Sequence, residues 1–277
     1  MQLINYQGSK QYLVNYINES IEPFITEGKF LLDICSGSGA ITNYYLNKSL
    51  VFSNDLEKYA QTLTDGMMHE YTLMRSKENI LPLIKKEIEK HKNALASVYE
   101  EFLAEEKQAI LEGDKARLLN LYKSIPTIWK SNLSSQKSLW SKLEGIDFNL
   151  FTTYYAGTYF GLKQAIDLDA IRYSLAKLKK FHCESTLLSI AFIAIMKASF
   201  SRDGHLAQPL SLEKNFARAL KVRSIDIENF FIDKVINFST NFADHKYCEN
   251  SKSFNKDILA LIEDENLLAK VYCVYFD

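Results

Sequence analysis

An apolar strand runs directly into a glycine-containing turn in the segment Phe30-Leu31-Leu32-Asp33-Ile34-Cys35-Ser36-Gly37-Ser38-Gly39. This pattern predicts a buried strand over residues 30–34, a Gly-Ser-Gly turn, and a helix from Ala40 to Asn47. A second strand is expected at Leu50-Val51-Phe52-Ser53. A strand, a turn, a helix and another strand in this order are typical of the opening of a parallel α/β sheet.

The turn has the composition of a nucleotide-binding turn. Glycines let backbone N–H groups approach a ligand closely. Asp55 follows Gly37 by 18 positions (55 − 37) and stands at the end of the second predicted strand, where a carboxylate can bind ribose hydroxyls. The third glycine of the dinucleotide fingerprint is absent. Nicotinamide cofactors and S-adenosylmethionine both contain adenosine, so this turn and Asp55 leave both cofactors open.

The rest of the chain favours helices, because it holds only 10 glycines and 4 prolines. Ser9 is expected to cap a first helix, and the strand pattern returns only near the last residues. The region between residues 241 and 256 is polar and predicts a loop. The expected helices span residues 9–22, two or three segments within 57–122, 168–180, 184–199 and 210–240, and the expected last strand spans 271–276.

Bulk properties exclude several classes of protein. The 277 residues carry a net charge of −1, so nucleic acid would have to bind a local basic patch. The four cysteines have no CxxC spacing, which argues against a metal site or a disulfide framework. The N-terminus lacks the pattern of a signal peptide. The most apolar run, Leu187 to Met196, is too short to span a bilayer. We therefore expect a cytoplasmic protein that binds neither metal nor membrane.

Two further segments, one before the turn and one far after it, add to this pattern. Tyr6-Gln7-Gly8-Ser9-Lys10 precedes it, and Val271-Tyr272-Cys273-Val274-Tyr275-Phe276-Asp277 ends the sequence. With the turn and Asp55, this order resembles the S-adenosylmethionine-dependent DNA adenine methyltransferases of the Dam-like group. Residues 154–173 and 199–209 also look like segments of adenine methyltransferases from type II restriction–modification systems.

The resemblance implies a set of roles for individual residues. Asp33 would face the amino group of the cofactor's methionine, Asp55 would bind its ribose, and Asp277 would be the catalytic acceptor for the amine of the target adenine. The base would be flipped out of the duplex to reach it. The implied S-adenosylmethionine-binding residues are Tyr6, Gly8, Ser9, Lys10, Asp33, Ser36, Gly37, Ser38, Gly39, Asn54, Asp55 and Asp257.

Contacts to double-stranded DNA are expected after residue 200. The resemblance places Arg202, His205 and Gln208 in a loop that approaches the DNA. The helix predicted beyond it carries Lys214, Arg218 and Lys221 at i, i+4 and i+7, a spacing that can follow phosphates. An ordinary solvated helix face explains the same three cations, and the sequence leaves both interpretations open.

The expected fold class is α/β, a Rossmann-like methyltransferase sheet with a large, mainly helical insertion. The cofactor-binding core would comprise residues 1–60 and 255–277, and the insertion, residues 61–254, would recognise the DNA target. In the family the last strand continues into Asp-Pro-Pro-Tyr, whereas this sequence ends at Asp277. We therefore expect an incomplete sheet, and weak or no activity without a C-terminal continuation or a complementing polypeptide. A cognate restriction endonuclease would be a further partner.

Two other functions remain open at this point. A nicotinamide-dependent oxidoreductase explains the glycine turn and Asp55 but leaves the segment from Tyr6 to Lys10 unexplained. A non-catalytic DNA-binding relative would keep the fold and transfer nothing. Competition between S-adenosylhomocysteine and NADH separates the first alternative from a methyltransferase, and a methyl-transfer assay separates the second.

Overall fold

A computed structural model describes residues 9–128, 133–178, 181–202, 208–237 and 246–277. The chain divides into two compact units. The sheet unit consists of residues 1–77, 181–190 and 235–277, and the helical unit consists of residues 78–180 and 191–234. Each unit is described by itself.

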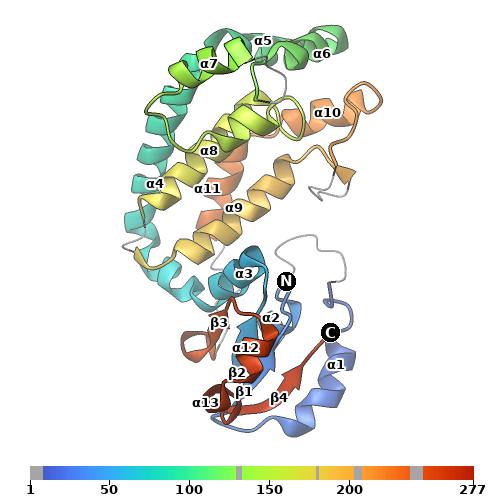
Figure 1. The fold of residues 1–277 in the computed structure, drawn as a ribbon, viewed down its shortest axis with the longest axis vertical. Coiled ribbons are helices and arrows are strands. Elements are labelled where there is room, and N and C mark those ends of the chain that lie inside the picture. The colour runs from blue at the N-terminus through green and yellow to red at the C-terminus, as the bar shows by residue number, and fades with distance from the viewer. Residues whose placement is uncertain (1–8, 129–132, 179–180, 203–207, 238–245) are drawn as a thin grey trace. The chain divides into compact units, whose positions relative to one another are not determined.

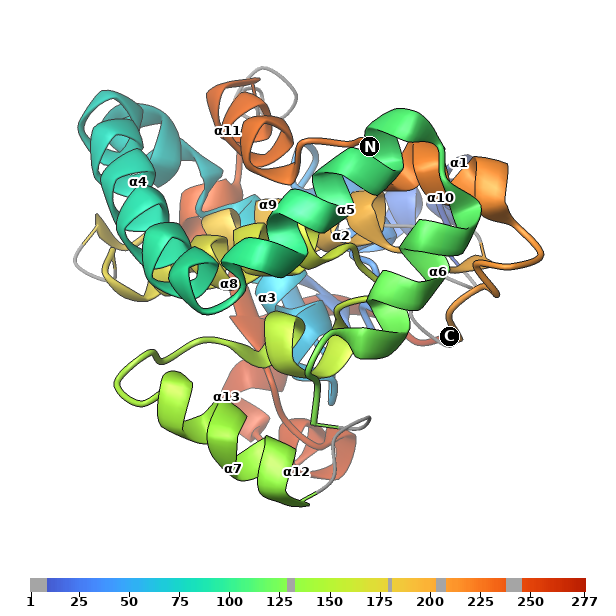
Figure 2. The same ribbon diagram turned by 90° about the horizontal axis from the view of Figure 1, so that it is seen from above.

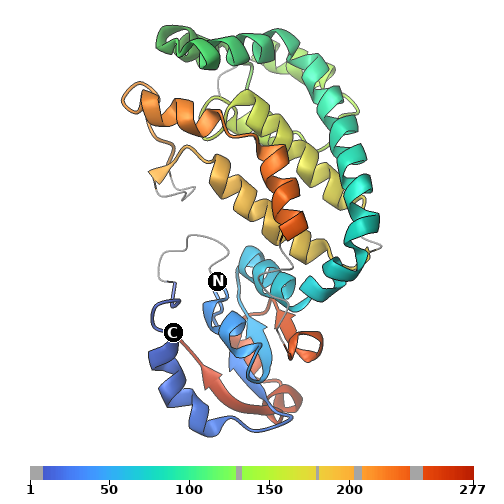
Figure 3. The same cartoon turned by 180° about the vertical axis from the view of Figure 1, so that it is seen from behind.

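The sheet unit is built on four parallel strands in the order β3-β2-β1-β4 (Figure 1). The first two strands along the chain, β1 (Phe30–Asp33) and β2 (Leu50–Asn54), lie at the centre of the sheet. They are flanked by β3 (Lys252–Phe254) and β4 (Val271–Tyr275), which come from the far end of the sequence. The predicted opening of a parallel α/β sheet is confirmed, and Figure 3 shows the same sheet from the other side.

The central strands are apolar because both of their faces are covered. Leu32 and Phe52 pack in one cluster with residues of α12 (Ile258–Ile262) and α13 (Glu265–Leu268). Leu31 and Val51 point to the opposite face, since side chains alternate along a strand, and they are fully buried as well. α2 (Ala40–Tyr45) and α3 (Lys58–Met68) contact these strands. The unit also contains α1 (Val14–Ile21), η1 (Glu22–Phe24) and η6 (Cys248–Asn250).

Two expectations about the sheet unit are wrong. The first helix begins at Val14, not at Ser9, and its N-terminus has no side-chain cap. Residues 252–254 form β3 where a loop was expected, because the backbone of Phe52 to Asn54 offers an open strand edge. The boundaries also differ from 1–60 plus 255–277, since residues 61–77, 181–190 and 235–254 belong to the sheet unit.

The helical unit is formed by long helices, as expected for a segment with few glycines and prolines. α5 contacts both α6 and α8, and Figure 2 shows the three helices from above. α8 begins six residues before the expected start at Leu168. The helices that contribute to this unit are α4 (Glu70–Val98), α5 (Glu100–Glu112), α6 (Lys115–Ser124), α7 (Leu133–Lys142), α8 (Leu162–Ala176), α9 (Glu184–Ala198), α10 (Phe216–Arg223) and α11 (Ile227–Asn237), with a π-helical turn at Phe151–Tyr155.

A buried polar network fixes the start of α8. The carboxylate of Glu106, on α5, accepts hydrogen bonds from the Tyr122 hydroxyl (2.7 Å) and from the backbone N–H groups of Leu162 (2.7 Å) and Lys163 (2.9 Å). The buried guanidinium of Arg223 donates to the carbonyls of Thr158 (2.8 Å) and Tyr159 (2.9 Å). These bonds satisfy backbone groups that a helix start and a turn leave without partners.

Across the part of the chain that the structure covers, no helix combines the length and the apolar character needed to cross a membrane.

Candidate cofactor site

One cavity of the sheet unit opens at the carboxyl ends of β1, β2 and β4. In open α/β sheets, ligands bind outside this edge because every parallel strand ends there. The cavity has a volume of about 370 Å³, which falls in the usual range for small-molecule sites. It is lined by Ser9, Lys10, Asp33, Cys35, Ser36, Gly37, Ser38, Ala40, Ile41, Asp55, Tyr275 and Asp277.

Three separate segments of predicted cofactor residues meet in this cavity. The segment before the first helix contributes Ser9 and Lys10, the turn after β1 contributes the residues from Ser36 to Ser38, and the end of β2 contributes Asp55. The Ser38 hydroxyl donates a hydrogen bond to the Ser9 hydroxyl at 3.4 Å, so these segments touch. Tyr6 and Gly8 lie outside the described residues.

Asp55 is positioned by the glycine turn. The backbone N–H of Gly37 donates to its Oδ2 at 2.8 Å, and the N–H of Glu57 donates to its Oδ1 at 2.9 Å. A carboxylate has about four lone-pair sites, so each oxygen of Asp55 can accept one more hydrogen bond. This geometry suits a ligand that brings a pair of hydroxyl groups to the end of β2.

Asp33 joins β1 to α2 and also lines the cavity. Its Oδ2 accepts two hydrogen bonds from Thr42, one from the hydroxyl (2.7 Å) and one from the backbone N–H (3.1 Å). Its Oδ1 accepts no hydrogen bond from the described residues and can receive a donor from a ligand. Burial raises the pKa of Asp33 to about 6, against the lowering effect of the bonds from Thr42. A cation bound at Asp33 would lower this pKa again.

Asp277 and Lys10 form an ion pair at the cavity wall. Their side chains are 46% and 27% exposed, so the pair is open to solvent. Lys10 therefore holds the carboxylate of Asp277 at the end of β4. Next to them, burial and then the negative charge of Asp55 raise the pKa of the Cys35 thiol, so the thiol stays protonated near neutral pH.

The hydroxyl of Ser36 gives a test of whether a polar ligand fits. Ser36 is buried at the cavity wall, and its Oγ has no hydrogen-bond partner among the described residues. A buried hydroxyl without a partner is costly, and a ligand atom in the cavity can satisfy it. The donor set of carboxylates, hydroxyls and one ammonium fits a polar zwitterionic ligand.

Three predicted cofactor residues do not line the cavity. Asn54 is fully buried, and its amide bonds to the carbonyls of Ile34 and Lys256 and to the N–H of Lys256. Asp257 is exposed and caps α12 by accepting from the N–H of Leu259. Gly39, with φ +75°, lies so close to Met67 that a Cβ would fall 2.9 Å from its methyl carbon. Gly39 therefore serves helix packing.

The cavity is also lined by residues that were not predicted from the sequence. Tyr275 could have been found from its spacing, because it stands two positions before Asp277 and neighbouring side chains of a strand alternate between faces. Cys35, Ala40 and Ile41 carry no such signal, because their residue types suit a core equally well. Burial, together with the charges of Asp277 and Asp33, raises the pKa of Tyr275 to about 12.

The predicted DNA-contacting residues all belong to the helical unit. Arg202, Gln208, Lys214, Arg218 and Lys221 are exposed, while His205 lies outside the described residues. Lys214 precedes α10, so the expected stripe of three cations on one helix is wrong. Arg218 and Lys221 do lie on α10, and Arg218 also donates to the carbonyl of Ser201 at 2.9 Å.

Comparison with known proteins identifies no relative: no protein-family model, no curated protein and no solved structure matches the chain. Within the described residues, no group of three or more His, Cys, Asp or Glu side chains is placed to hold a metal ion.

Proposed function

We propose that this chain is an S-adenosylmethionine-dependent DNA adenine methyltransferase, of the kind found in restriction–modification systems. The observation that carries the proposal is the convergence of Ser9-Lys10, the Asp33-to-Ser38 segment, Asp55 and Asp277 on one cavity. These segments were selected from a single motif order, and they lie far apart in the sequence. If these segments resembled the family only by chance, they would have no reason to line the same cavity.

The side chains that line the cavity match individual chemical groups of S-adenosylmethionine. Asp33 offers a free carboxylate oxygen to an ammonium group, and Asp55 offers two oxygens to a ribose diol. Ser36 offers a hydroxyl that lacks a partner. Bound S-adenosylmethionine supplies the methyl group for transfer.

Asp277 is the residue of this chain placed to act on the amine of adenine. That amine is a poor nucleophile, because its lone pair is delocalised into the ring. A carboxylate that accepts a hydrogen bond from one of its N–H groups favours a pyramidal and more nucleophilic nitrogen. Lys10 is the positioning residue, since its ion pair holds Asp277 at the cavity. Alignment of the amine with the methyl group then provides much of the rate gain.

The first test is cofactor binding measured by isothermal titration calorimetry. S-adenosylhomocysteine should bind the full chain with a one-to-one stoichiometry, and NADH should not compete. The nicotinamide alternative shares the glycine turn and Asp55, so binding of NADH without S-adenosylhomocysteine would replace the proposal with an oxidoreductase.

The second test is transfer of label from methyl-labelled S-adenosylmethionine to unmethylated duplex DNA of mixed sequence. Label on the adenine exocyclic amine is the expected result. Its loss in a Lys10→Ala variant that still binds S-adenosylhomocysteine would support the positioning role of Lys10. Salt-dependent DNA binding with no cofactor binding would favour the non-catalytic relative instead.

A further inference from the structure

The cavity of the sheet unit carries an unbalanced charge. It is lined by three carboxylates, those of Asp33, Asp55 and Asp277. Lys10 is the one cation among the described residues that line it, and it already pairs with Asp277. When all four groups are ionised, their formal charges sum to −2 (1 − 3). An excess of one sign inside a cleft attracts a ligand of the opposite sign.

The negative charges act on the same part of the cavity. Cys35 lies in the turn that follows β1, two residues after Asp33, and its side chain lines the cavity. Burial raises the pKa of the Cys35 thiol most, and the negative charges of all three carboxylates raise it further. A positive charge placed beside Cys35 is therefore attracted by three carboxylates at once.

The cavity also contains buried polar atoms that are available to a ligand. Asp33 is 1% exposed, and its Oδ1 accepts no hydrogen bond from the described residues. Ser36 is 7% exposed, and its Oγ has no partner among them either. Both residues line the cavity. Because buried polar groups in proteins are normally satisfied, these atoms indicate a ligand site and not a chance cluster of acidic residues.

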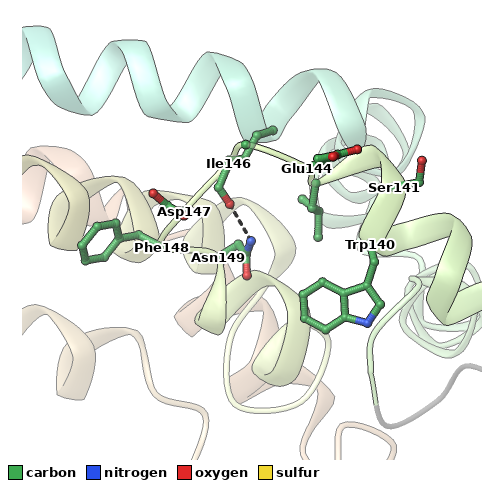
Figure 4. A pocket seen from close by; sticks show the side chains of 9 residues that line it. Trp140, Ser141, Glu144, Ile146, Asp147, Phe148 and Asn149 are labelled. Atoms are coloured by element: carbon green, nitrogen blue, oxygen red, sulfur yellow. Dashed lines mark hydrogen bonds between the residues drawn. The ribbon is translucent and has the colours of Figure 1, made fainter.

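The cavity of the helical unit shows a different arrangement of charge. It has a volume of about 550 Å³, and its lining residues fall between Trp140 and Asn149. Its two carboxylates, Glu144 and Asp147, are exposed, and Figure 4 shows them on opposite sides of the space. The amide of Asn149 donates to the carbonyl of Ile146 at 2.7 Å. Carboxylates that point apart into solvent do not act together on one ligand.

We propose that the charge of the cavity in the sheet unit selects the methyl donor over the demethylated product, an inference that rests on the proposed function. S-adenosylmethionine has a carboxylate, an ammonium and a sulfonium, which leave one net positive charge. S-adenosylhomocysteine has a neutral thioether in place of the sulfonium and no net charge. The sulfur joins the methionine part to the ribose. With the ammonium at Asp33 and the ribose at Asp55, the sulfonium lies between these two carboxylates.

This selectivity has a consequence for turnover. Transfer of the methyl group turns the sulfonium into a thioether, so the ligand loses the positive charge that the carboxylates attract. The product is therefore held less tightly than the donor, and fresh S-adenosylmethionine displaces it. We expect the chain to be inhibited only weakly by S-adenosylhomocysteine.

The test is isothermal titration calorimetry of the full chain at pH 7.0 and low salt with three ligands. S-adenosylmethionine should have a dissociation constant at least about tenfold lower than that of S-adenosylhomocysteine. The two ligands share the ammonium, the carboxylate and the adenosine, so their ratio isolates the sulfonium and its methyl group. Sinefungin has a carbon with an ammonium group in place of the sulfonium, so it separates charge from methyl contacts. It should bind like S-adenosylmethionine.

Two variants change the charge of the cavity in opposite directions. Asp277→Asn removes a negative charge and should reduce the preference for S-adenosylmethionine at least about threefold. Lys10→Gln removes the positive charge and should increase the preference by about the same factor. Glu263→Gln is the matched control: Glu263 is exposed and does not line the cavity, so the preference should stay within about twofold.

The outcomes separate this inference from the proposed function. If S-adenosylhomocysteine bound as tightly as S-adenosylmethionine or more tightly, charge selection would be wrong, and the proposed function would stand. A preference that neither charge variant changed, or sinefungin that bound like S-adenosylhomocysteine, would assign the preference to methyl contacts and would also overturn the inference. If none of the three ligands bound, the proposed function would fall, and the inference with it.

Discussion

Charged side chains of the sheet unit and of the helical unit face different surroundings. In the sheet unit, Asp33, Asp55 and Asp277 all reach one cavity, and each keeps an oxygen available to a ligand. In the helical unit, Glu106 and Arg223 bond to the protein itself and fix the start of α8. A charged residue thus marks a ligand site only where its lone pairs or protons remain free.

The largest expected effect tests the helical side of this comparison. Glu106→Ala would remove the carboxylate that accepts hydrogen bonds from the Tyr122 hydroxyl and from two backbone N–H groups of α8. Breaking such a network should cost about 3–5 kcal/mol in the free energy of unfolding, measured by urea denaturation. Glu105→Ala removes a neighbouring carboxylate, which is 40% exposed and pairs with Arg117, and should cost much less. Equal costs would show that Glu106 does not have the structural role assigned to it.

The next effect tests the sheet side. Asp55→Asn should weaken S-adenosylhomocysteine binding by roughly ten- to a hundredfold, because charged hydrogen bonds to the ribose are lost, with little change in stability. The comparison is Asp257→Asn, whose side chain caps α12 outside the cavity and should leave affinity within about twofold. Calorimetry on both variants shows whether the residues that line the cavity, rather than all residues selected from the sequence, bind the cofactor.

A third prediction concerns a buried charge with neither a ligand nor a network. Glu70 is buried, one of its oxygens has no partner among the described residues, and desolvation raises its pKa to about 8. The neutral form stabilises the fold, so this contribution is present at acid pH and is lost as the pH rises from about 4.5 through 8. Between pH 6 and 8 the loss should be roughly 2 kcal/mol.

Glu70→Gln removes this titration. The variant should show a flatter stability profile than the natural chain between pH 6 and 8, measured by urea denaturation at each pH. Parallel profiles would mean that Glu70 ionises in the folded protein without cost.

The smallest expected effect concerns Asp33. Its pKa of about 6 means that the carboxyl is mostly protonated at pH 5, where it attracts an ammonium group less. S-adenosylhomocysteine affinity should therefore fall about tenfold from pH 7.5 to pH 5, with proton release on binding at the lower pH. Asp33→Asn should bind weakly at both values. An affinity that is independent of pH in the natural chain would exclude Asp33 as the ammonium partner.

Local patterns predicted the centre of the sheet unit well. The strand–turn–helix–strand order and the carboxylates at the strand ends follow from short-range rules, and the structure contains them. The edge strand β3 was missed because Lys-Ser-Phe has no strand pattern of its own and forms only against Phe52 to Asn54. Long-range pairing of this kind leaves no local signal.

The errors in the site have an equally physical origin. Asn54 is the last residue of β2 and Asp55 follows it directly, so their side chains point in different directions, and only Asp55 faces the cavity. Asp257 was selected by its place in the chain, but a helix starts there and uses its carboxylate as a cap. Motif order located the cavity, and strand and helix geometry decided which residues reach it.

The placement of β3 and β4 at the far end of the sequence has a consequence for biosynthesis. Asn54 pairs with Phe254, 200 residues later (254 − 54), and Phe30 pairs with Val271, 241 residues later (271 − 30). At roughly 5–20 residues per second, a ribosome needs about 10–40 seconds to supply the missing strands. During that interval β1 and β2 have both outer edges open, while residues 78–180 of the helical unit have already emerged. Nascent chains are therefore most exposed to aggregation, and most in need of chaperones, before β3 and β4 are made.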